Sequence, residues 1–405
     1  MLYTAYQAQS DLMGPVRAMS RANARLLTDL SPGLSDRWMT RQALATSEII
    51  HRWGLTHRRP PFGIDSVTVA GQEVAVREEA VVSTPFGTLL RFAKDTDALQ
   101  PRVLLVAPLS GHFATLLRAT VRTMLADHDV FITDWHNARD VSAAAGRFGF
   151  DEYIEHLIGF LGAMGPGAHV VAVCQPCVPA LAAAALMAED GDPATPRSLT
   201  LMAGPIDARV SPTVVNDLAA GRPREWFERN VIGIVPPRFL GAGRRVYPGF
   251  VQVAAFIRMN PDRHRAAFQR LYDDIVSGNE ARATMTKAFY DEYFAVLDLT
   301  AEFYLETVAA IFQDHLLAEG RLEYRGRPVK PAAITRTALF TIEGERDDIC
   351  GVGQTAAAQE LCTSLPPFRR RQHLQAGVGH FGVFSGSRWE LEVYPLIRSL
   401  ILMSH

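Results

Sequence analysis

From residue 102 onward, the chain alternates short apolar segments with longer stretches of helical character. This alternation restricts the fold more than any other feature. The apolar segments lie at residues 103–107, 130–133, 169–173, 198–202 and 337–342, and a more polar one follows at 370–375. Near-continuous apolar runs are typical of strands that are buried on both faces. Strands that alternate with helices predict a mostly parallel, doubly wound α/β sheet.

The remaining segments predict additions to this sheet. Residues 1–56 show helical spacing, and the helix-breaking HRRPP of 57–61 follows, so we expect an N-terminal helical segment over residues 1–60. A hairpin is expected around Gly71. Residues 208–325 contain no clear strand but many aromatic residues, which predicts a helical cap. The α/β core is therefore assigned to 61–207 and 326–405.

Composition indicates a globular protein and excludes some partners. Of the 405 residues, 48% are hydrophobic and 21% are charged, which is typical of a chain that buries a large core. The formal net charge is −2, so no basic excess exists to neutralise phosphates. We therefore expect no nucleic-acid partner. The oligomeric state stays open, a homo-oligomer included.

The N-terminus and the cysteines point to one compartment. The first residues lack a cationic start followed by an apolar run, and no stretch approaches the roughly 18 apolar residues of a membrane span. Four cysteines in a chain of this length do not form a disulfide framework. We expect a protein of the reducing cytoplasm without a transmembrane segment.

The sharpest local motif is Ala172-Val173-Cys174-Gln175-Pro176. A predicted buried strand ends at this point and a helix begins near residue 178. A strand, a nucleophile and a helix in this order, with small residues two positions to either side, form a nucleophile elbow. Ala172 fits this pattern, whereas Pro176 stands where glycine is usual. The helix N-terminus would favour the thiolate of Cys174.

Other interpretations of Cys174 remain open. Cys174 and Cys177 form C-x-x-C, which is found in redox pairs and in halves of zinc sites. A zinc site is disfavoured because no second C-x-x-C exists and Cys350 and Cys362 lie apart in the sequence. A redox pair is disfavoured by the length of the chain. Two small buried thiols would be an ordinary core feature.

Two downstream loops favour the nucleophile. Asp347 and Asp348 follow the segment 337–342, and His380 follows the segment 370–375. The order nucleophile, acid, histidine is that of α/β-hydrolases, and each residue would lie at the strand edge where open α/β sheets place their sites. His380 would be the general base, and the acid would orient its imidazole. Asp207, after the segment 198–202, is the alternative acid.

The loop after the first parallel strand, Pro108-Leu109-Ser110-Gly111-His112, occupies the place that supplies one oxyanion-hole N–H in this fold. We assign the second N–H to Gln175 and the first to Ser110, with Leu109 and Gly111 as alternatives. Trp135 and His112 are the residues that we expect to contact substrate. No metal or organic cofactor is needed for this chemistry.

Together these motifs resemble one known family. The chain is similar to the intracellular polyhydroxyalkanoate (polyhydroxybutyrate) depolymerases in six places. These are the cysteine elbow, Gly344-Glu345-Arg346-Asp347-Asp348, Gly379-His380-Phe381-Gly382, the loop at 107–112, the segment 131–135 and the opening MLYTAYQAQSDLM. The similarity runs through nearly the whole chain.

The resemblance implies a fold and an activity. It implies an α/β-hydrolase in which Cys174, Asp347 and His380 form the triad, and which hydrolyses the esters of stored polyester granules or of 3-hydroxyacyl oligomers in the cytoplasm. Aromatic residues of the predicted cap would contact the apolar polymer. The alternatives are a polyhydroxyalkanoate synthase, whose elbow has glycines that this one lacks, a thioesterase, or a non-catalytic granule-coating protein.

Overall fold

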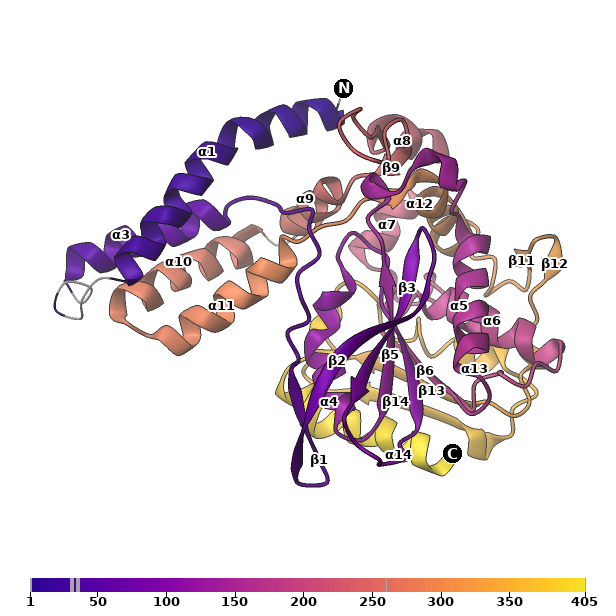
Figure 1. Cartoon of the computed structure of the whole chain (residues 1–405). Helices are drawn as coiled ribbons and strands as arrows, with labels where there is room; N and C mark the ends of the chain where they lie inside the picture. Colours follow the sequence, from indigo (N-terminus) through magenta and orange to yellow (C-terminus); the bar gives the residue numbers. More distant parts are fainter. Residues whose placement is uncertain (1, 30–32, 34–36, 260, 405) are drawn as a thin grey trace.

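A computed structural model describes residues 2–29, 33, 37–259 and 261–404. Its centre is a nine-stranded sheet in the order β1-β2-β3-β5-β4-β6-β7-β13-β14, with helices on both faces (Figure 1). The strands are β1 Ser66–Val69, β2 Gln72–Ser83, β3 Gly87–Lys94, β4 Arg102–Val106, β5 Asp129–Trp135, β6 His169–Val173, β7 Ser198–Met202, β13 Ala338–Gly344 and β14 Arg370–Gln375.

The strand order establishes the fold. The pairs from β5 through β4, β6, β7 and β13 to β14 are parallel, whereas β1, β2 and β3 form an antiparallel extension that joins β5. From β2 onward this is the order of an α/β-hydrolase sheet, with one additional edge strand, β1. The predicted fold class is confirmed. Each predicted core strand forms, although β5 and β13 each run two residues further than the apolar pattern indicated.

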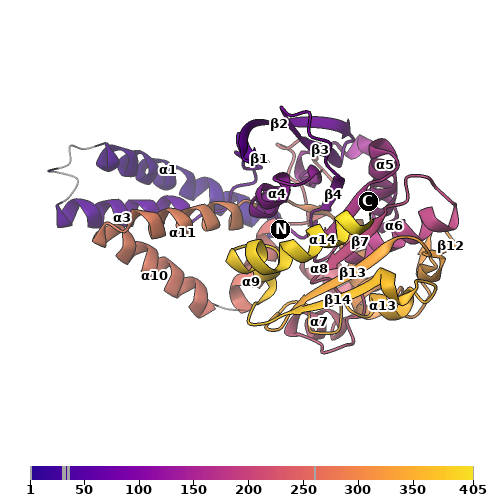
Figure 2. The same cartoon turned by 90° about the horizontal axis from the view of Figure 1, so that it is seen from below.

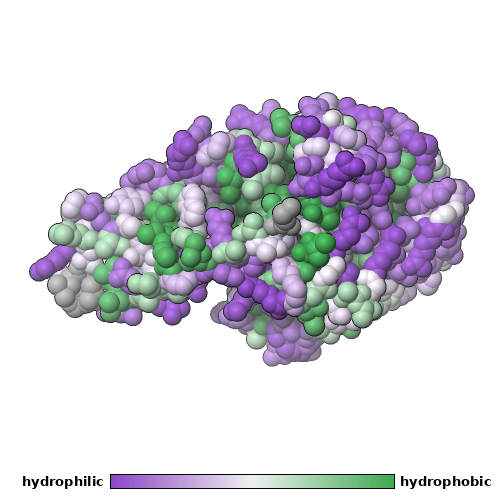
Figure 3. Space-filling model, turned by 90° about the horizontal axis from the view of Figure 1, so that it is seen from above, coloured by the Kyte–Doolittle hydropathy of each residue, from purple (hydrophilic) through white to green (hydrophobic). Residues whose placement is uncertain are grey.

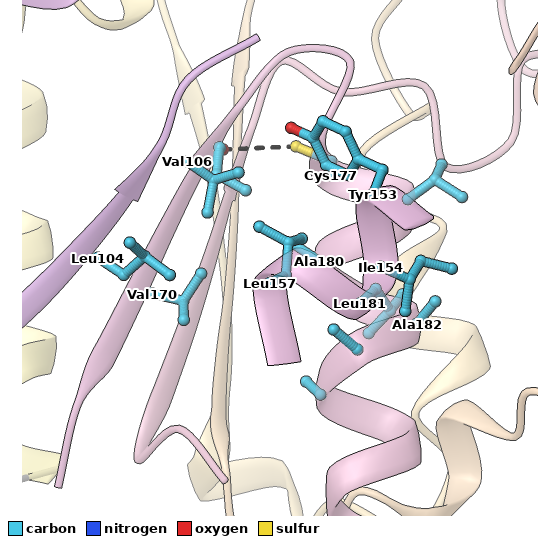
Figure 4. Packing of buried hydrophobic residues seen from close by; sticks show 14 of the residues in the cluster. Leu104, Val106, Tyr153, Ile154, Leu157, Val170, Cys177, Ala180, Leu181 and Ala182 are labelled. Atoms are coloured by element: carbon cyan, nitrogen blue, oxygen red, sulfur yellow. Dashed lines mark hydrogen bonds between the residues drawn. The ribbon is translucent and has the colours of Figure 1, made fainter. Parts of the chain in front are cut away.

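The two faces of the sheet are covered by different helices, as strand periodicity requires. Leu104 and Val106 of β4 pack in one cluster with α5 (Phe150–Met164) and α6 (Cys177–Glu189). Figure 4 shows this packing. Val103 and Leu105 of the same strand pack in the other cluster, with α4 (Arg118–Leu125) and α14 (Tyr394–Ser404). Every residue of β6 is buried, which explains its continuous apolar run.

The insertion between β7 and β13 is mostly helical. Its helices are α7 Val214–Ala220, α8 Arg224–Asn230, α9 Gly249–Met259, α10 Pro261–Ser277, α11 Glu280–Tyr293 and α12 Ala301–Thr307. The prediction that residues 208–325 contain no strand is wrong. A small antiparallel sheet joins β8 Gly233–Ile234, β9 Arg245–Tyr247 and β10 Leu299–Thr300, and β11 Glu323–Tyr324 pairs with β12 Arg327–Pro328. Strands of two or three residues are too short to show an alternating pattern.

The N-terminal helices pack against this insertion. The helices α1 (Leu2–Thr28) and α3 (Trp38–Arg52) lie beside α10 and α11, and the four form an elongated arm that projects from the core (Figures 1 and 2). Ala45 of α3 is buried with Phe268 and Leu271 of α10 and with Tyr290 of α11. The segments assigned as N-terminal helices and as cap are therefore joined by one apolar cluster.

The outer surface of the arm carries many apolar side chains. Leu12, Met19 and Leu26 of α1 recur every seven residues and are each more than 60% exposed. Viewed from above, apolar side chains gather over the arm and where the arm meets the core (Figure 3). Within the described ranges, no helix has both the length and the apolar character that crossing a membrane requires.

Asp298 links the base of the arm to the core. It is fully buried, accepts a hydrogen bond from Tyr3 Oη at 2.5 Å and accepts another from the Gly249 N–H at 2.9 Å. Its own N–H donates to Asn137 Oδ1 at 2.9 Å. Burial raises the pKa of Asp298 to about 6, and the two hydrogen bonds offset this only in part. The carboxylate and the backbone N–H of one residue thus connect α1, α9 and the loop after β5.

Replacing Asp298 by asparagine is expected to change how stability depends on pH. Between pH 3.8 and 6 the folded protein holds more protons at Asp298 than the unfolded chain, so this group destabilises the fold as pH rises. The Asp298→Asn variant should therefore gain roughly 2–3 kcal/mol of unfolding free energy relative to wild type between pH 4.5 and 7.5. Urea unfolding at both pH values measures the difference. Asp262→Asn, at an exposed residue of α10, is the control, and a pH-independent difference for Asp298→Asn would contradict the assignment.

Candidate active site

Cys174 lies at the sharp turn between β6 and α6. Its φ is +68°, in the left-handed region that residues other than glycine rarely adopt. The Cys174 N–H donates to the Met202 carbonyl at 2.7 Å, which continues the β6–β7 pairing for one more residue. The strand therefore ends at the cysteine and the helix begins three residues later. A strained strand–turn–helix of this kind exposes its central side chain at the edge of the sheet.

Gly204 makes this turn possible. A Cβ atom on Gly204 would lie 2.2 Å from Cys177 Sγ and 2.6 Å from the Cys174 carbonyl oxygen, so any larger residue would displace the turn. The close approach expected of small residues near the nucleophile thus comes partly from the loop after β7. No local pattern indicates this role, because Gly204 lies thirty residues from Cys174 in the chain.

The other three cysteines are buried. Cys177 is inaccessible and its thiol donates to the Ala172 carbonyl at 3.4 Å, next to the ring of Tyr153 in Figure 4. Burial raises the pKa of Cys177 well above its usual range, and it does the same for Cys350. All four thiols are free, and only Cys174 is partly exposed. The C-x-x-C therefore contains one accessible thiol and one packed thiol.

Asp347 and His380 form a direct pair. His380 Nδ1 donates to Asp347 Oδ2 at 2.8 Å, and the Asp347 side chain is fully buried. The second carboxylate oxygen accepts the N–H groups of Ile349 and Cys350, each at 2.9 Å. Both oxygens therefore have partners, which fixes the carboxylate and, through it, the orientation of the imidazole.

The imidazole is also coupled to the thiol. Burial lowers the pKa of His380, but the charges of Cys174 and Asp347 and the hydrogen bonds to both raise the pKa well above its usual value in sum. His380 is therefore bonded to the acid through Nδ1, and the Cys174 side chain is close enough to raise the pKa of the ring. This arrangement suits proton transfer between the thiol and the imidazole.

The alternative acids are placed differently. Asp207 is paired with Arg209, through Oδ1 to Nε at 2.9 Å and Oδ2 to Nη2 at 2.9 Å, and the hydrogen bonds from Arg209 lower its pKa. Asp348 lines the cavity beside His380. Of the three carboxyl groups considered from the sequence, Asp347 is the one bonded to the histidine.

The loop after β4 is connected to the elbow through Gln175. The side-chain oxygen of Gln175 accepts the N–H of Leu109 at 3.3 Å, so this N–H is already engaged. Gly111 has a φ of +98° and its carbonyl accepts the N–H of Leu297, which turns the loop at Ser110. The side-chain Nε2 of Gln175 is buried and has no partner among the described residues. Gln175 thus holds together the two segments assigned to the oxyanion hole.

Trp135 and His112, predicted to contact substrate, are both buried. Trp135 is 1% exposed, and its Nε1–H donates to the Ala107 carbonyl at 3.0 Å. His112 is buried, and its Nε2–H donates to the Tyr293 carbonyl at 3.1 Å. Burial lowers the pKa of His112 to about 4, so the ring is neutral at pH 7. In this structure Trp135 supports the core and His112 joins the core to α11.

A cavity of about 570 Å³ opens at His380. It separates the catalytic loops from helices α9, α10 and α11 of the cap. The residues that line it are Phe256, Met259, Arg263, His264, Ala267, Arg270, Met285, Thr286, Phe289, Tyr290, Tyr293, Arg346, Asp348, Ile349, Gly379, His380, Phe381 and Gly382.

A larger cavity of about 870 Å³, between α1, α9 and the other side of α10, lies away from the triad residues. Within the described part of the chain, no group of three or more His, Cys, Asp or Glu side chains could hold a metal ion.

Glu343 was missed by the sequence analysis. It is the penultimate residue of β13 and is 1% exposed. Its Oε1 accepts the N–H groups of Gly353, Thr355 and Ala356 at 2.8–3.1 Å. These bonds hold the far end of the loop that carries Asp347 against strand β13. An acidic residue inside an apolar strand was the available signal.

Comparison with known proteins gives a family match. Residues 203–404 match the family model described as the PHB de-polymerase C-terminus. A search of curated proteins found no match.

A search of solved structures found similar chains at low sequence identity. One is 2-hydroxy-6-oxo-6-phenylhexa-2,4-dienoate hydrolase from Rhodococcus sp. strain RHA1, with 11% identity, 82% of this chain and 98% of that chain covered, and a TM-score of 0.42. Another is a thermophilic esterase from Thermogutta terrifontis, with 15% identity, 84% and 98% covered, and a TM-score of 0.41. A third is a monoacylglycerol lipase from Paleococcus ferrophilus, with 12% identity, 75% and 95% covered, and a TM-score of 0.41.

Alkylation with iodoacetamide tests the environment of the thiols. In the native protein at pH 7, Cys174 should be modified while Cys177, Cys350 and Cys362 stay protected, because these three are buried. Replacing His380 by glutamine should slow the modification of Cys174 at least about tenfold, because the imidazolium that favours the thiolate is lost. Peptide mass spectrometry measures each site, and the urea-unfolded chain, in which all four thiols react, is the control. Equal modification of Cys177 in the native state, or a Cys174–Cys177 disulfide, would instead favour the redox interpretation.

Proposed function

Because this chain belongs to the PHB (polyhydroxybutyrate) depolymerase family, we propose that it hydrolyses the ester bonds of poly(3-hydroxybutyrate) and related polyhydroxyalkanoates with a Cys174–His380–Asp347 triad. The observation that carries the proposal is the place of His380 between an acid and a thiol. Its Nδ1 is bonded to the buried Asp347 carboxylate at 2.8 Å, and Cys174, on the left-handed turn, raises the pKa of the same ring.

In the acylation step, the Cys174 thiolate attacks the ester carbonyl carbon and forms a C–S bond. The carbonyl oxygen becomes an oxyanion, which the N–H groups of Gln175 and Ser110 would stabilise. When the tetrahedral intermediate collapses, the C–O bond to the alcohol breaks and His380 gives its proton to the departing oxygen. The product is a thioester on Cys174 and a released hydroxyl group.

In the deacylation step, His380 takes a proton from water, and the resulting hydroxide attacks the thioester carbonyl. The C–S bond then breaks, which releases a carboxylic acid and restores the Cys174 thiolate. Asp347 keeps the same imidazole orientation in both steps and stabilises the positive charge on the ring. All proton transfers are completed by these three side chains and water.

The cap fits an apolar substrate. Phe256 of α9 and Phe289, Tyr290 and Tyr293 of α11 line the cavity at His380, so aromatic surface faces the place where the polymer chain would enter. Phe289 is 39% exposed, which makes it available at the rim. Trp226 and Phe303, by contrast, belong to other apolar clusters. The proposed setting is the surface of a storage granule in the cytoplasm.

Incubation with amorphous poly(3-hydroxybutyrate) granules tests the proposal. The wild-type protein should release soluble 3-hydroxy acids, whereas Cys174→Ala should release none, because no acyl-enzyme can form. Cys177→Ala is the matched control and should retain most of the activity, since its thiol only fills space behind the elbow. Polymer growth from an activated monomer would favour a synthase, and release from small thioesters alone would favour a thioesterase. Absence of activity on each of these substrates would favour a granule-coating role.

A pair of substitutions tests the assignment of the acid. Asp347→Asn should preserve the fold but lower kcat about 10²- to 10⁴-fold, because the imidazole loses its orienting charge. Asp348→Asn and Asp207→Asn should change kcat by less than about threefold, since Asp347 is the carboxylate bonded to His380 and Asp207 is bonded to Arg209. Steady-state kinetics on a soluble 3-hydroxybutyrate oligomer gives these values. A larger loss in Asp207→Asn or Asp348→Asn than in Asp347→Asn would reverse the assignment.

A further inference from the structure

The cavity at His380 carries more positive charge than a neutral polyester requires. Arg263 and Arg270 of α10 and Arg346 of the loop after β13 line it, together with His264. Asp348 is the one carboxylate among the described lining residues. The lining therefore has three permanent positive charges against one negative charge, in a chain whose formal net charge is −2.

The two arginines of α10 face the cavity together. Residues seven positions apart lie on one face of a helix, two turns from each other. Burial raises the pKa of Tyr290, which lines the same cavity, and the charges of Arg263 and Arg270 lower it in part. Both guanidinium groups therefore act on the cavity wall formed by α11. Both are also solvent-exposed, which places them where a ligand can reach them.

An uncharged ester segment gains little binding free energy from a group of three arginine side chains. A carboxylate gains a charge-assisted hydrogen bond from each guanidinium and is attracted before contact. In a polyester chain, the single anionic group is the free carboxylate at one end. That carboxylate belongs to the terminal 3-hydroxy acid unit, which forms the alcohol side of the last ester bond.

We propose that this cationic group binds the carboxylate end of the substrate, so that the enzyme removes terminal 3-hydroxy acid units from chain ends and soluble oligomers. This inference rests on the proposed function and specifies which ester bond is cleaved. The last ester bond breaks as the acyl group transfers to Cys174, and the released alcohol is a monomer that carries the bound carboxylate. Water then frees the shortened chain with a new carboxylate end. Arg263, Arg270 and Arg346 are thus specificity-determining residues.

The test compares a linear 3-hydroxybutyrate trimer that has a free carboxylate with the methyl ester of the same trimer. The wild-type kcat/KM should be about five- to tenfold higher for the free acid, and 0.5 M NaCl should reduce this preference. The double variant Arg263→Gln/Arg270→Gln should bring the ratio close to one, mainly through a higher KM for the free acid. Arg282→Gln, at an exposed arginine of α11 outside the cavity, is the matched control and should keep the wild-type ratio.

The outcomes separate this inference from the proposed function. Equal kcat/KM for both trimers, or a ratio that the double variant leaves unchanged, overturns the inference while the ester hydrolysis itself stands. Inhibition of methyl-ester hydrolysis by adenosine 3′,5′-bisphosphate, without preference for the free acid, also overturns it. The recognised anion would then be the phosphate of an acyl-thioester carrier. If the wild type cleaves neither trimer nor the granules, the proposed function fails first.

Discussion

The left-handed turn at Cys174 is the constraint on which the rest of the site depends. A non-glycine residue at φ +68° costs roughly 1–3 kcal/mol, and the fold retains it only because the surroundings fix the turn. β6 is buried between β4 and β7, α6 packs on the sheet, and the turn packs so closely on Gly204 that no larger residue fits there. The same packing buries Cys177 directly behind the elbow. One of two closely spaced thiols is thus presented to solvent and the other becomes part of the core.

The acid side of the site is held by backbone N–H groups. Asp347 accepts two of them besides His380, and Glu343 accepts three from the following loop. A buried carboxylate requires such partners, because its charge has lost water. The two acidic residues therefore have different tasks on one strand–loop unit. Glu343 holds the loop, and Asp347 holds the imidazole of His380.

The arm supplies aromatic rings and charge to the cavity at His380. Helices α10 and α11 contribute rings and arginines to its lining. Helix α3 packs with them in one apolar cluster, and α1 packs against α3. Asp298 connects this arm to the core through Tyr3, Gly249 and Asn137. Because an uncharged polymer and an anionic chain end make different demands, the mixture of phenyl rings and guanidinium groups matches a substrate that is apolar along its length and charged at its end.

The sequence by itself determined the sheet and the residue types at its edge. The apolar runs identified the buried parallel strands, since burial on both faces leaves a continuous pattern, and the order of Cys174, Asp347 and His380 along the chain placed three reactive side chains after three of those strands. Only the tertiary structure decided between Asp347, Asp348 and Asp207, because the choice depends on a 2.8 Å contact to a residue far along the chain. It also decided that Trp135 and His112 are buried and that the N-terminal helices join the cap. The close packing of the elbow on Gly204, and the three N–H groups that Glu343 accepts, were likewise visible only in the folded chain. Each of these depends on neighbours that are distant in sequence, and local periodicity carries no information about such neighbours.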